Sequence, residues 1–94
     1  MTYELEFDPR ALKEWQKLGE TVKSQFKKRL KVVLSNPRIE SARLHDLPDC
    51  YKIKLKASGY RLVYQVRDEF VTVFVVAVGK REKSAVYRGA NQRL

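Results

Sequence analysis

A chain of 94 residues is long enough for one domain only, which we take to span residues 1–94. Its 20 Lys and Arg residues against 11 Asp and Glu give a formal net charge of +9, and its single cysteine excludes an intramolecular disulfide and a multi-cysteine zinc site. With no apolar leader and no apolar run near the roughly 18 residues of a membrane span, the sequence predicts a cytoplasmic protein that binds no membrane, metal or cofactor.

The chain begins with a strand and a helix. Residues 3–7 alternate apolar and acidic side chains, which is the period of a half-buried strand. Asp8 and Pro9 then suit the N-cap and the first position of a helix, and we expect Gly19 to end that helix. One face of the helix is apolar, so we expect Trp15 on that face to lie in the core rather than to stack on a nucleic-acid base.

A second helix follows, capped by Thr21 and stopped by Pro37. Its apolar positions recur every three or four residues from Val22 to Leu34. Its basic residues lie on the outer side, and the sequence gives equal weight to a solvated face and to a secondary contact with phosphates. These basic residues are Lys27, Lys28, Arg29 and Lys31.

The segment 38–50 has no clear period and is expected to be a loop. It holds the only histidine, His45, and it ends at the only cysteine, Cys50. Neither residue belongs to a recognisable nucleophile motif, so we assign catalysis to neither.

Three strands and a last helix complete the chain. Residues 51–57 alternate strictly, Ser58-Gly59 suits a tight turn, and residues 60–66 form the next strand. Residues 70–78 are almost continuously apolar, which is typical of a central strand covered on both faces, and Ser84 suits the N-cap of a short final helix. The predicted fold is α+β in the order β-α-α-β-β-β-α, with a helical hairpin packed on a mainly antiparallel sheet.

The positive charge is concentrated in the second half of the chain. Residues 1–50 hold 10 basic and 8 acidic side chains, a balance of +2, whereas residues 51–94 hold 10 basic and 3 acidic ones, a balance of +7. A solvated surface does not require this asymmetry, but a face that binds a polyanion does. Charge alone therefore favours nucleic acid as the partner, ahead of a membrane surface or an acidic protein.

A two-residue turn at Ser58-Gly59 would fix the partners in the hairpin, with Lys56 opposite Arg61. Like charges opposite each other destabilise a sheet, and no acid between residues 51 and 67 relieves them. A bound polyanion therefore accounts for this cluster better than a row of lysines that protects a sheet edge. The predicted cationic face comprises Lys52, Lys54, Lys56 and Arg61.

The next turn extends this face. If Asp68-Glu69 closes it, Arg61 faces Val76, and the end of the strand brings Tyr87 and three further cations close to the cluster. The same register puts Phe74 and Val76 on the basic face, where the C-terminal helix, a base or a protein partner would cover them. The added cations are Lys80, Arg81 and Lys83.

Such a face suits RNA that is locally single-stranded, because cations hold phosphates and a tyrosine stacks on a base. Cleavage through the 2′-OH needs a general base, a general acid and stabilisation of the phosphorane. The basic face offers neither His nor Glu apart from the nearby Glu82, although clustered cations can lower the pKa of a lysine enough to make it a base. From the residues alone, binding is favoured over catalysis.

Over nearly its whole length the sequence resembles the RelE family of bacterial toxins, within the RelE/ParE toxin–antitoxin superfamily. The stretch Gly-Tyr-Arg-Leu-Val-Tyr marks the superfamily, whereas the lysine strand with the terminal tyrosine is specific to the ribosome-dependent ribonuclease branch. The segments that carry the resemblance are FDPRALKEW (7–15), LPDCYKIKL (47–55), SGYRLVYQV (58–66), VGKRE (78–82) and VY (86–87).

The resemblance implies an endoribonuclease that enters the ribosomal A site and cleaves the mRNA there by attack of the 2′-OH, which inhibits translation. It implies that Lys52 and Lys54 are active-site lysines, with Lys54 the general base. Arg61 would stabilise the phosphorane, Arg81 would assist the leaving group, and Tyr87 would stack on a codon base.

The resemblance also implies partners. A cognate RelB-like antitoxin would wrap the toxin and disturb its C-terminal helix, and operator DNA would be bound only by the toxin–antitoxin complex. The remaining basic surface would hold RNA, above all ribosomal RNA of the small subunit, through Lys56, Lys80, Lys83, Arg88, Lys27, Lys28 and Lys31.

Two other functions stay open at this point. A gyrase-poisoning toxin of the same superfamily shares the fold but generally lacks the lysine, arginine and tyrosine set found here. A non-catalytic RNA-binding or operator-binding module, including a toxin that has lost its activity, is the second, yet none of the family's active-site positions is missing from this sequence.

Overall fold

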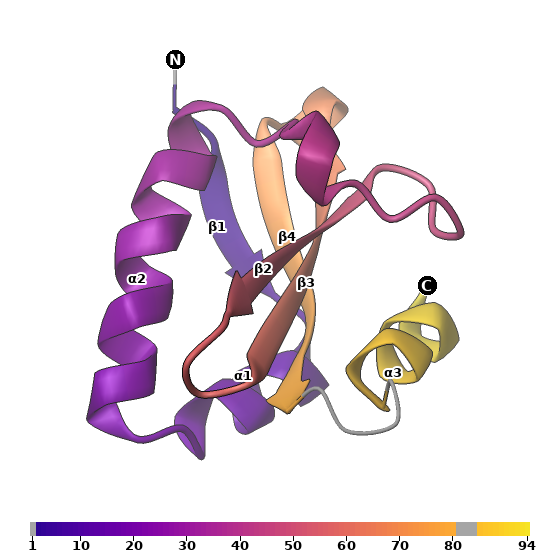
Figure 1. The fold of residues 1–94 in the computed structure, drawn as a ribbon. Helices are drawn as coiled ribbons and strands as arrows, with labels where there is room; N and C mark the ends of the chain where they lie inside the picture. Colours follow the sequence, from indigo (N-terminus) through magenta and orange to yellow (C-terminus); the bar gives the residue numbers. More distant parts are fainter. Residues whose placement is uncertain (1, 81–84) are drawn as a thin grey trace.

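Four strands and three α-helices, joined by two 3₁₀ turns, make up the part of the chain that the computed structural model describes, residues 2–80 and 85–94 (Figure 1). Their order confirms the predicted β-α-α-β-β-β-α arrangement and the α+β class. Ser84, the predicted cap of the last helix, lies outside the described residues. The elements are β1 (Glu4–Phe7), α1 (Pro9–Gln16), α2 (Glu20–Ser35), η1 (Glu40–Ala42), β2 (Cys50–Leu55), β3 (Tyr60–Arg67), η2 (Asp68–Phe70), β4 (Thr72–Lys80) and α3 (Ala85–Arg93).

The strands form one sheet in the order β1-β4-β3-β2, in which β1 runs parallel to β4 and the other neighbours are antiparallel. Helices α1 and α2 pack on one face, and α3 lies on the other (Figure 1). Strand β4 is therefore an inner strand covered on both faces, as its apolar sequence predicted. Strand β2 is an edge strand, so its lysines lie at the rim of the sheet.

The helix starts and stops follow local chemistry. The Asp8 carboxylate accepts a hydrogen bond from the Arg10 amide at 2.9 Å, and Pro9 occupies the first turn of α1. Helix α2 ends at Ser35, just before Asn36 and Pro37. Both predictions are confirmed.

The junction between the two helices differs from the prediction. Helix α1 already ends at Gln16, and Gly19, predicted to end it, is instead the N-cap of α2. The Gly19 carbonyl accepts a hydrogen bond from the Lys23 amide at 3.0 Å. Helix α2 therefore begins before Thr21, the predicted cap, because the backbone of Gly19 closes the first turn.

Two apolar cores lie on the two faces of the sheet. In the first, the Trp15 ring lies between Phe7 and Phe26, with ring centroids 5.5 Å and 6.0 Å away, so its predicted core position is confirmed. In the second, Val76 is buried beneath α3, and Phe74 packs against the same core. Of the three covers that the sequence left open for Phe74 and Val76, the C-terminal helix is the one that packs on them.

The turn between β2 and β3 is longer than predicted. Lys54, not Lys56, faces Arg61. A four-residue loop follows Leu55, and in it the Gly59 amide donates to the Leu55 carbonyl at 2.9 Å while Gly59 takes a φ of +75°. The register moves by two residues, and this preserves the alternation of side chains, so the predicted faces hold although the predicted partners were wrong.

The turn between β3 and β4 differs as well. Arg61 faces Gly79 rather than Val76. The turn contains η2 and Val71, which has a left-handed φ of 49°, and a register shift opposite Val63 and Tyr64 adds one further residue, Val76, on the β4 side. Together these displace the predicted pairing by three positions.

Candidate functional site

Lys54 and Arg61 form the centre of the cationic face. They are directly opposed on β2 and β3, and Arg61 is only 7% exposed. Its guanidinium donates to the Tyr60 carbonyl at 3.3 Å and has no carboxylate partner among residues 2–80 and 85–94. A buried cation without an acid is costly, so this arrangement is typical of a site that receives an anion.

The start of α3 lies next to this pair. Gly79 is opposite Arg61, and a Cβ placed on Gly79 would lie 3.8 Å from the Cβ of Val86. Val86 is buried in the second core, and Tyr87 is half-buried against the same core. The packing of α3 on β4 therefore sets the position of the Tyr87 ring.

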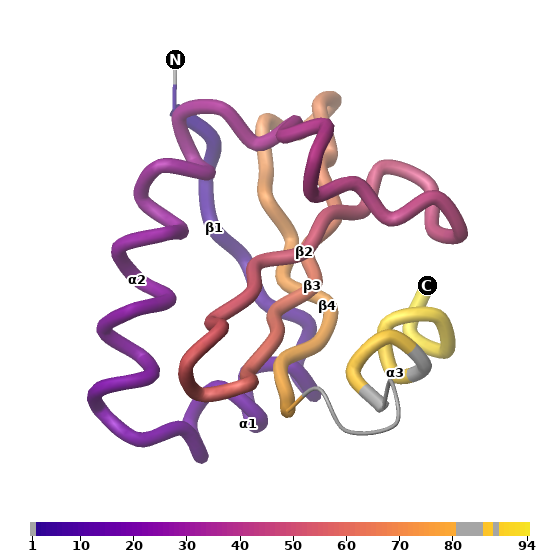
Figure 2. Tube along the Cα trace, in the orientation of Figure 1, coloured from indigo at the N-terminus to yellow at the C-terminus, as the bar shows by residue number. Residues whose placement is uncertain are grey.

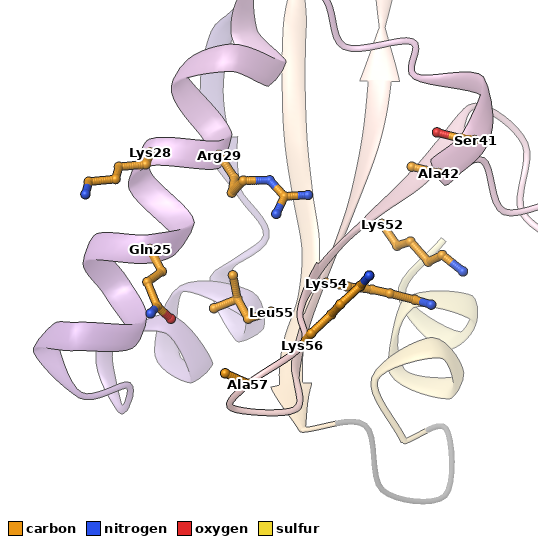
Figure 3. A pocket seen from close by; sticks show the side chains of 10 residues that line it. All are labelled: Gln25, Lys28, Arg29, Ser41, Ala42, Lys52, Lys54, Leu55, Lys56 and Ala57. Atoms are coloured by element: carbon orange, nitrogen blue, oxygen red, sulfur yellow. The ribbon is translucent and has the colours of Figure 1, made fainter.

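A groove of about 590 Å³, which we call the basic groove, runs between α2 and the edge strand β2 (Figure 3). Arg29 reaches from α2 towards the sheet edge, whereas the side chains of Lys52 and Lys54 extend towards the side where α3 lies (Figure 3). The described residues that line the groove include five cations and no acid, so its charge complements a polyanion backbone. The five are Lys28, Arg29, Lys52, Lys54 and Lys56.

The loop that leads into β2 lies on the same side of the sheet as α3 (Figure 2), and a second hollow of about 510 Å³, which we call the α3 hollow, is lined by residues of both. His45 and Asp46 line it from the loop, and Tyr87 and Asn91 line it from α3. Lys52 lines both the hollow and the basic groove, so the two are continuous at this residue. No pattern in the sequence indicates that His45 or Asp46 lines the same hollow as Tyr87, because the path of an aperiodic loop is set by long-range packing.

The basic residues of α2 divide between two sides of the helix. Lys28 lines the basic groove together with Arg29. Lys27 and Lys31 instead flank an apolar hollow beside β1, which includes Trp15. Helical periodicity alone could have separated them, because positions 28 and 29 share a side of the helix that positions 27 and 31 do not.

Besides Tyr87, four of the predicted site residues lie at the end of β4 or beyond it. The Lys80 ammonium lies 5.6 Å from the centroid of the Tyr60 ring, and Tyr60 packs against the first core. Lys80 is therefore on the face of the sheet that α1 and α2 cover, not beside Arg61 as predicted. Arg81 and Lys83 lie outside the described residues, and for Arg88, within α3, only the backbone is described.

An ion pair holds the end of α3. The Arg93 guanidinium donates to the Glu14 carboxylate at 2.8 Å and to the Val76 carbonyl at 2.8 Å, and the Val78 amide donates to Glu14 at 3.1 Å. These β4 groups lie beyond the last residue that pairs with β1. Glu14 of α1 and Arg93 of α3 thus bind the β4 backbone groups that no neighbouring residue of β1 pairs with. These contacts hold α3, which carries Tyr87, against the sheet.

The reactive groups elsewhere in the described part of the chain offer no catalytic centre. Burial, reinforced by the charge of Asp49, raises the pKa of the Cys50 thiol to about 11, and that thiol donates to the Pro48 carbonyl at 3.3 Å. Cys50 is therefore a poor nucleophile at neutral pH. Within the described residues there is no group of three or more His, Cys, Asp or Glu side chains that could hold a metal ion. None of the described helices is long and apolar enough to cross a membrane.

Known proteins resemble this chain over its whole length. The family described as the ParE toxin of the type II toxin-antitoxin system, parDE, matches residues 5–85. The mRNA interferase toxin RelE of Escherichia coli K12 is 64% identical over 94 residues, covering 100% of this chain and 99% of that one.

Two solved structures extend this likeness to the fold. A mutant of E. coli RelE in the free state superposes with a TM-score of 0.93 at 63% identity, covering 100% of this chain and 99% of that one. The same mutant in complex with a peptide of the antitoxin RelB superposes with a TM-score of 0.83, with the same identity and coverage. The chain therefore belongs to the RelE family of mRNA interferase toxins, within the ParE-type group of type II toxin–antitoxin toxins.

Proposed function

We propose that this protein is the toxin of a type II toxin–antitoxin pair and that it cleaves mRNA in the A site of the ribosome, in the bacterial cytoplasm. The ribose 2′-OH attacks the adjacent phosphate and the 5′-oxygen leaves, which gives a cyclic phosphate and a free 5′-hydroxyl. No metal or cofactor enters this reaction.

The observation that carries the proposal is the environment of Arg61. Arg61 is buried, stands opposite Lys54 and lacks a carboxylate partner among the described residues. A phosphate between the two side chains would supply the missing negative charge, and this need grows as the phosphorane gains its second charge. The arrangement is thus more favourable for the transition state than for the free protein.

The remaining roles follow from the chemistry of each side chain. Lys54, next to Arg61, takes the proton of the 2′-OH, with Lys52 beside it on β2 as a second cation for the phosphate. Arg81 assists the departing 5′-oxygen. Tyr87 stacks on a codon base and orients the ribose for attack.

The dependence on the ribosome follows from what the site lacks. The lining of the basic groove contains no His or Glu for efficient proton transfer among the described residues, so the rate must depend strongly on positioning of the mRNA. The basic groove would hold ribosomal RNA of the small subunit through Lys28 and Lys56, together with Arg29, for which the sequence left a solvated face and a secondary phosphate contact open. Lys27, Lys31, Lys80, Lys83 and Arg88 would supply further phosphate contacts.

A RelB-like antitoxin is the expected protein partner, because a relative of this chain has been solved in complex with a RelB peptide. We expect the antitoxin to act on α3, since α3 carries Tyr87, and we expect operator DNA to be bound only by the toxin–antitoxin complex.

One alternative has a specific observation in its favour. The family description that matches residues 5–85 is that of ParE. This match favours the gyrase-poisoning toxin that the sequence left open. The cationic cluster and Tyr87 have no evident use in that function, so we rank it second. A non-catalytic RNA-binding or operator-binding module ranks third.

Programmed ribosomes separate the three. Purified protein is added to ribosomes that hold a defined A-site codon and, in parallel, to the same mRNA without ribosomes, and the 3′ ends are mapped. Cleavage within the A-site codon only on ribosomes is expected. If neither sample is cleaved, the proposal is wrong, and a supercoiling assay with gyrase then tests the alternative.

Variants separate the site from the docking surface. Tyr87→Ala and Lys54→Ala are expected to lower the single-turnover rate by about 10²-fold or more, with little change in ribosome affinity. Lys27→Ala is the matched control on α2, expected to alter only the salt dependence of binding. An equal loss of rate in all three variants would contradict this division.

A further inference from the structure

We infer that the α3 hollow is a base-reading subsite, in which Asp46 and Asn91 select the nucleobase that stacks on Tyr87, with guanine preferred. This inference rests on the proposed function and assigns a specificity role to residues outside the catalytic set.

The first support is that the hollow is lined by polar groups without partners. The side chains of His45, Asp46 and Asn91 are exposed, and none makes a hydrogen bond or ion pair with another described residue. They come from two segments that are far apart in the sequence, the loop before β2 and helix α3, and they line the same hollow. Their donors and acceptors are therefore available to a ligand between the loop and α3.

The second support is charge. Every charged side chain in the described lining of the basic groove is a cation, whereas the α3 hollow contains the Asp46 carboxylate. A carboxylate repels phosphate but accepts hydrogen bonds readily, so the hollow suits a neutral base rather than the RNA backbone. The change of character at Lys52, which lines both spaces, separates the part that holds phosphates from the part that holds a base.

The third support is the aromatic wall. Tyr87 is half-buried against the second core, so part of its ring packs on the protein while part remains accessible to a ligand. A base stacked on that ring would present its Watson–Crick edge to the rest of the lining, as is common for single-stranded RNA. His45 lines the same hollow from the loop and offers a second ring to the base.

The choice of guanine follows from hydrogen-bond geometry. An ionised carboxylate only accepts hydrogen bonds, and guanine alone presents two adjacent donors, N1–H and the N2 amino group, on its Watson–Crick edge. The Asn91 amide can donate to the guanine O6 acceptor beside them. Adenine and cytosine offer one amino group next to an acceptor, and uracil offers one N–H between two acceptors.

The test compares A-site codons that differ by one base at each of the three positions. Single-turnover cleavage rates are measured for the native protein, for Asp46→Asn and for Glu69→Gln. Glu69 is an exposed acid in η2 on a different part of the surface, so its variant removes the same charge away from the hollow. Asp46→Asn is expected to reduce the preference for guanine about tenfold, and Glu69→Gln to leave the preference unchanged.

A binding measurement tests the base-reading subsite separately from the proposed ribonuclease activity. The full-length protein is titrated with GMP and, separately, with UMP, and NMR shifts are followed at the Asn91 side-chain amide and at residues 44–47. GMP is expected to move these signals at lower concentration than UMP, and Asp46→Asn to abolish the difference. If ribosomes are not cleaved while GMP is still selected, the proposed function is wrong but the subsite stands. If the native protein cleaves and Asp46→Asn keeps its codon preference, or if GMP and UMP act alike, the subsite is refuted.

Discussion

The contact between Glu14 and Arg93 lends itself to a quantitative prediction, because it joins three elements at one point. The Arg93 side chain is 13% exposed and donates to the Val76 carbonyl and to Glu14, both at 2.8 Å. We expect Arg93→Ala to release the end of α3 from β4 without disturbing the first core, since that core lies on the other face of the sheet.

The size of the effect can be worked from these contacts. A hydrogen bond to a charged group contributes about 1.5–3 kcal/mol, whereas an exposed ion pair contributes only about 0.2–1 kcal/mol. The Glu14 side chain is 36% exposed, which reduces the Glu14 contribution, but the bond to the buried carbonyl is kept in full. We expect a total of about 2 kcal/mol, equivalent to about a 30-fold change in the opening equilibrium.

Amide hydrogen exchange measured by NMR reports this opening residue by residue. In Arg93→Ala the amides of α3 should exchange about 30-fold faster, while those around Phe26 in α2 should keep their rates. The matched control is Arg43→Ala, which breaks an exposed pair with Glu40 at 3.5 Å and should change exchange by less than about threefold.

Two results would refute the reasoning. One is a change in α3 exchange no larger than that of the control, because the ion pair would then contribute nothing. The other is an equal acceleration throughout the chain, because α3 would then open only with global unfolding. Glu14→Gln adds an internal check, since its amide oxygen can still accept from the Val78 amide and should cause a smaller change than Arg93→Ala.

Three further predictions concern stability and reactivity. Tyr64→Phe should lower the free energy of unfolding in urea by about 1–3 kcal/mol, because the buried Tyr64 hydroxyl donates to the Pro37 carbonyl at 2.8 Å; an unchanged midpoint would show that water replaces the bond. Hydrogen bonds from Arg10 hold the pKa of Asp8 below its usual range, so this carboxylate stabilises the fold fully above about pH 4 and loses that contribution as the pH falls through its folded pKa. Asp8→Asn keeps the helix cap but removes the charge, so the free energy of unfolding should fall less steeply at acid pH than in the native protein. The same steepness in both proteins would contradict a stabilising contact between Asp8 and Arg10. With its pKa raised to about 11, the Cys50 thiol should be alkylated by iodoacetamide at pH 8 at least about 100-fold more slowly than in the urea-unfolded chain, and comparable rates would show that the thiol is accessible.

Local patterns predicted most of the fold because they depend on near neighbours. The alternation in residues 51–57 put Lys52 and Lys54 on one face of the sheet, and a two-residue error in register did not change that face. The partners themselves could not be predicted, since they depend on turn lengths. Val71, a β-branched residue, takes a left-handed φ that nothing in its composition indicates.

The candidate site could be predicted only where strand alternation defines it. Lys54 and Arg61 were placed on the correct face, whereas Lys80 was not, because the register shift between β3 and β4 turns its side chain towards the first core. His45 and Asp46 were left without a role, since their position beside Tyr87 depends on how a loop without period packs against a distant helix.

Arg61 differs from two other arginines of the chain, because it has no carboxylate partner among the described residues whereas Arg93 and Arg38 do. Arg93 is paired with Glu14, and Arg38 donates to Asp68 at 2.7 Å and to Asp49 at 3.1 Å, so the chain places acids beside arginines where they serve structure. Like charges across a strand pair cost about 0.2–1 kcal/mol, and a buried arginine that has no carboxylate partner among the described residues is typical of a functional position. An acid beside Arg61 would stabilise the free protein, but it would occupy the position that a phosphate must take. The two apolar cores allow the fold to tolerate that cost, and a guanidinium that has no carboxylate partner among residues 2–80 and 85–94 suits the binding of a phosphate.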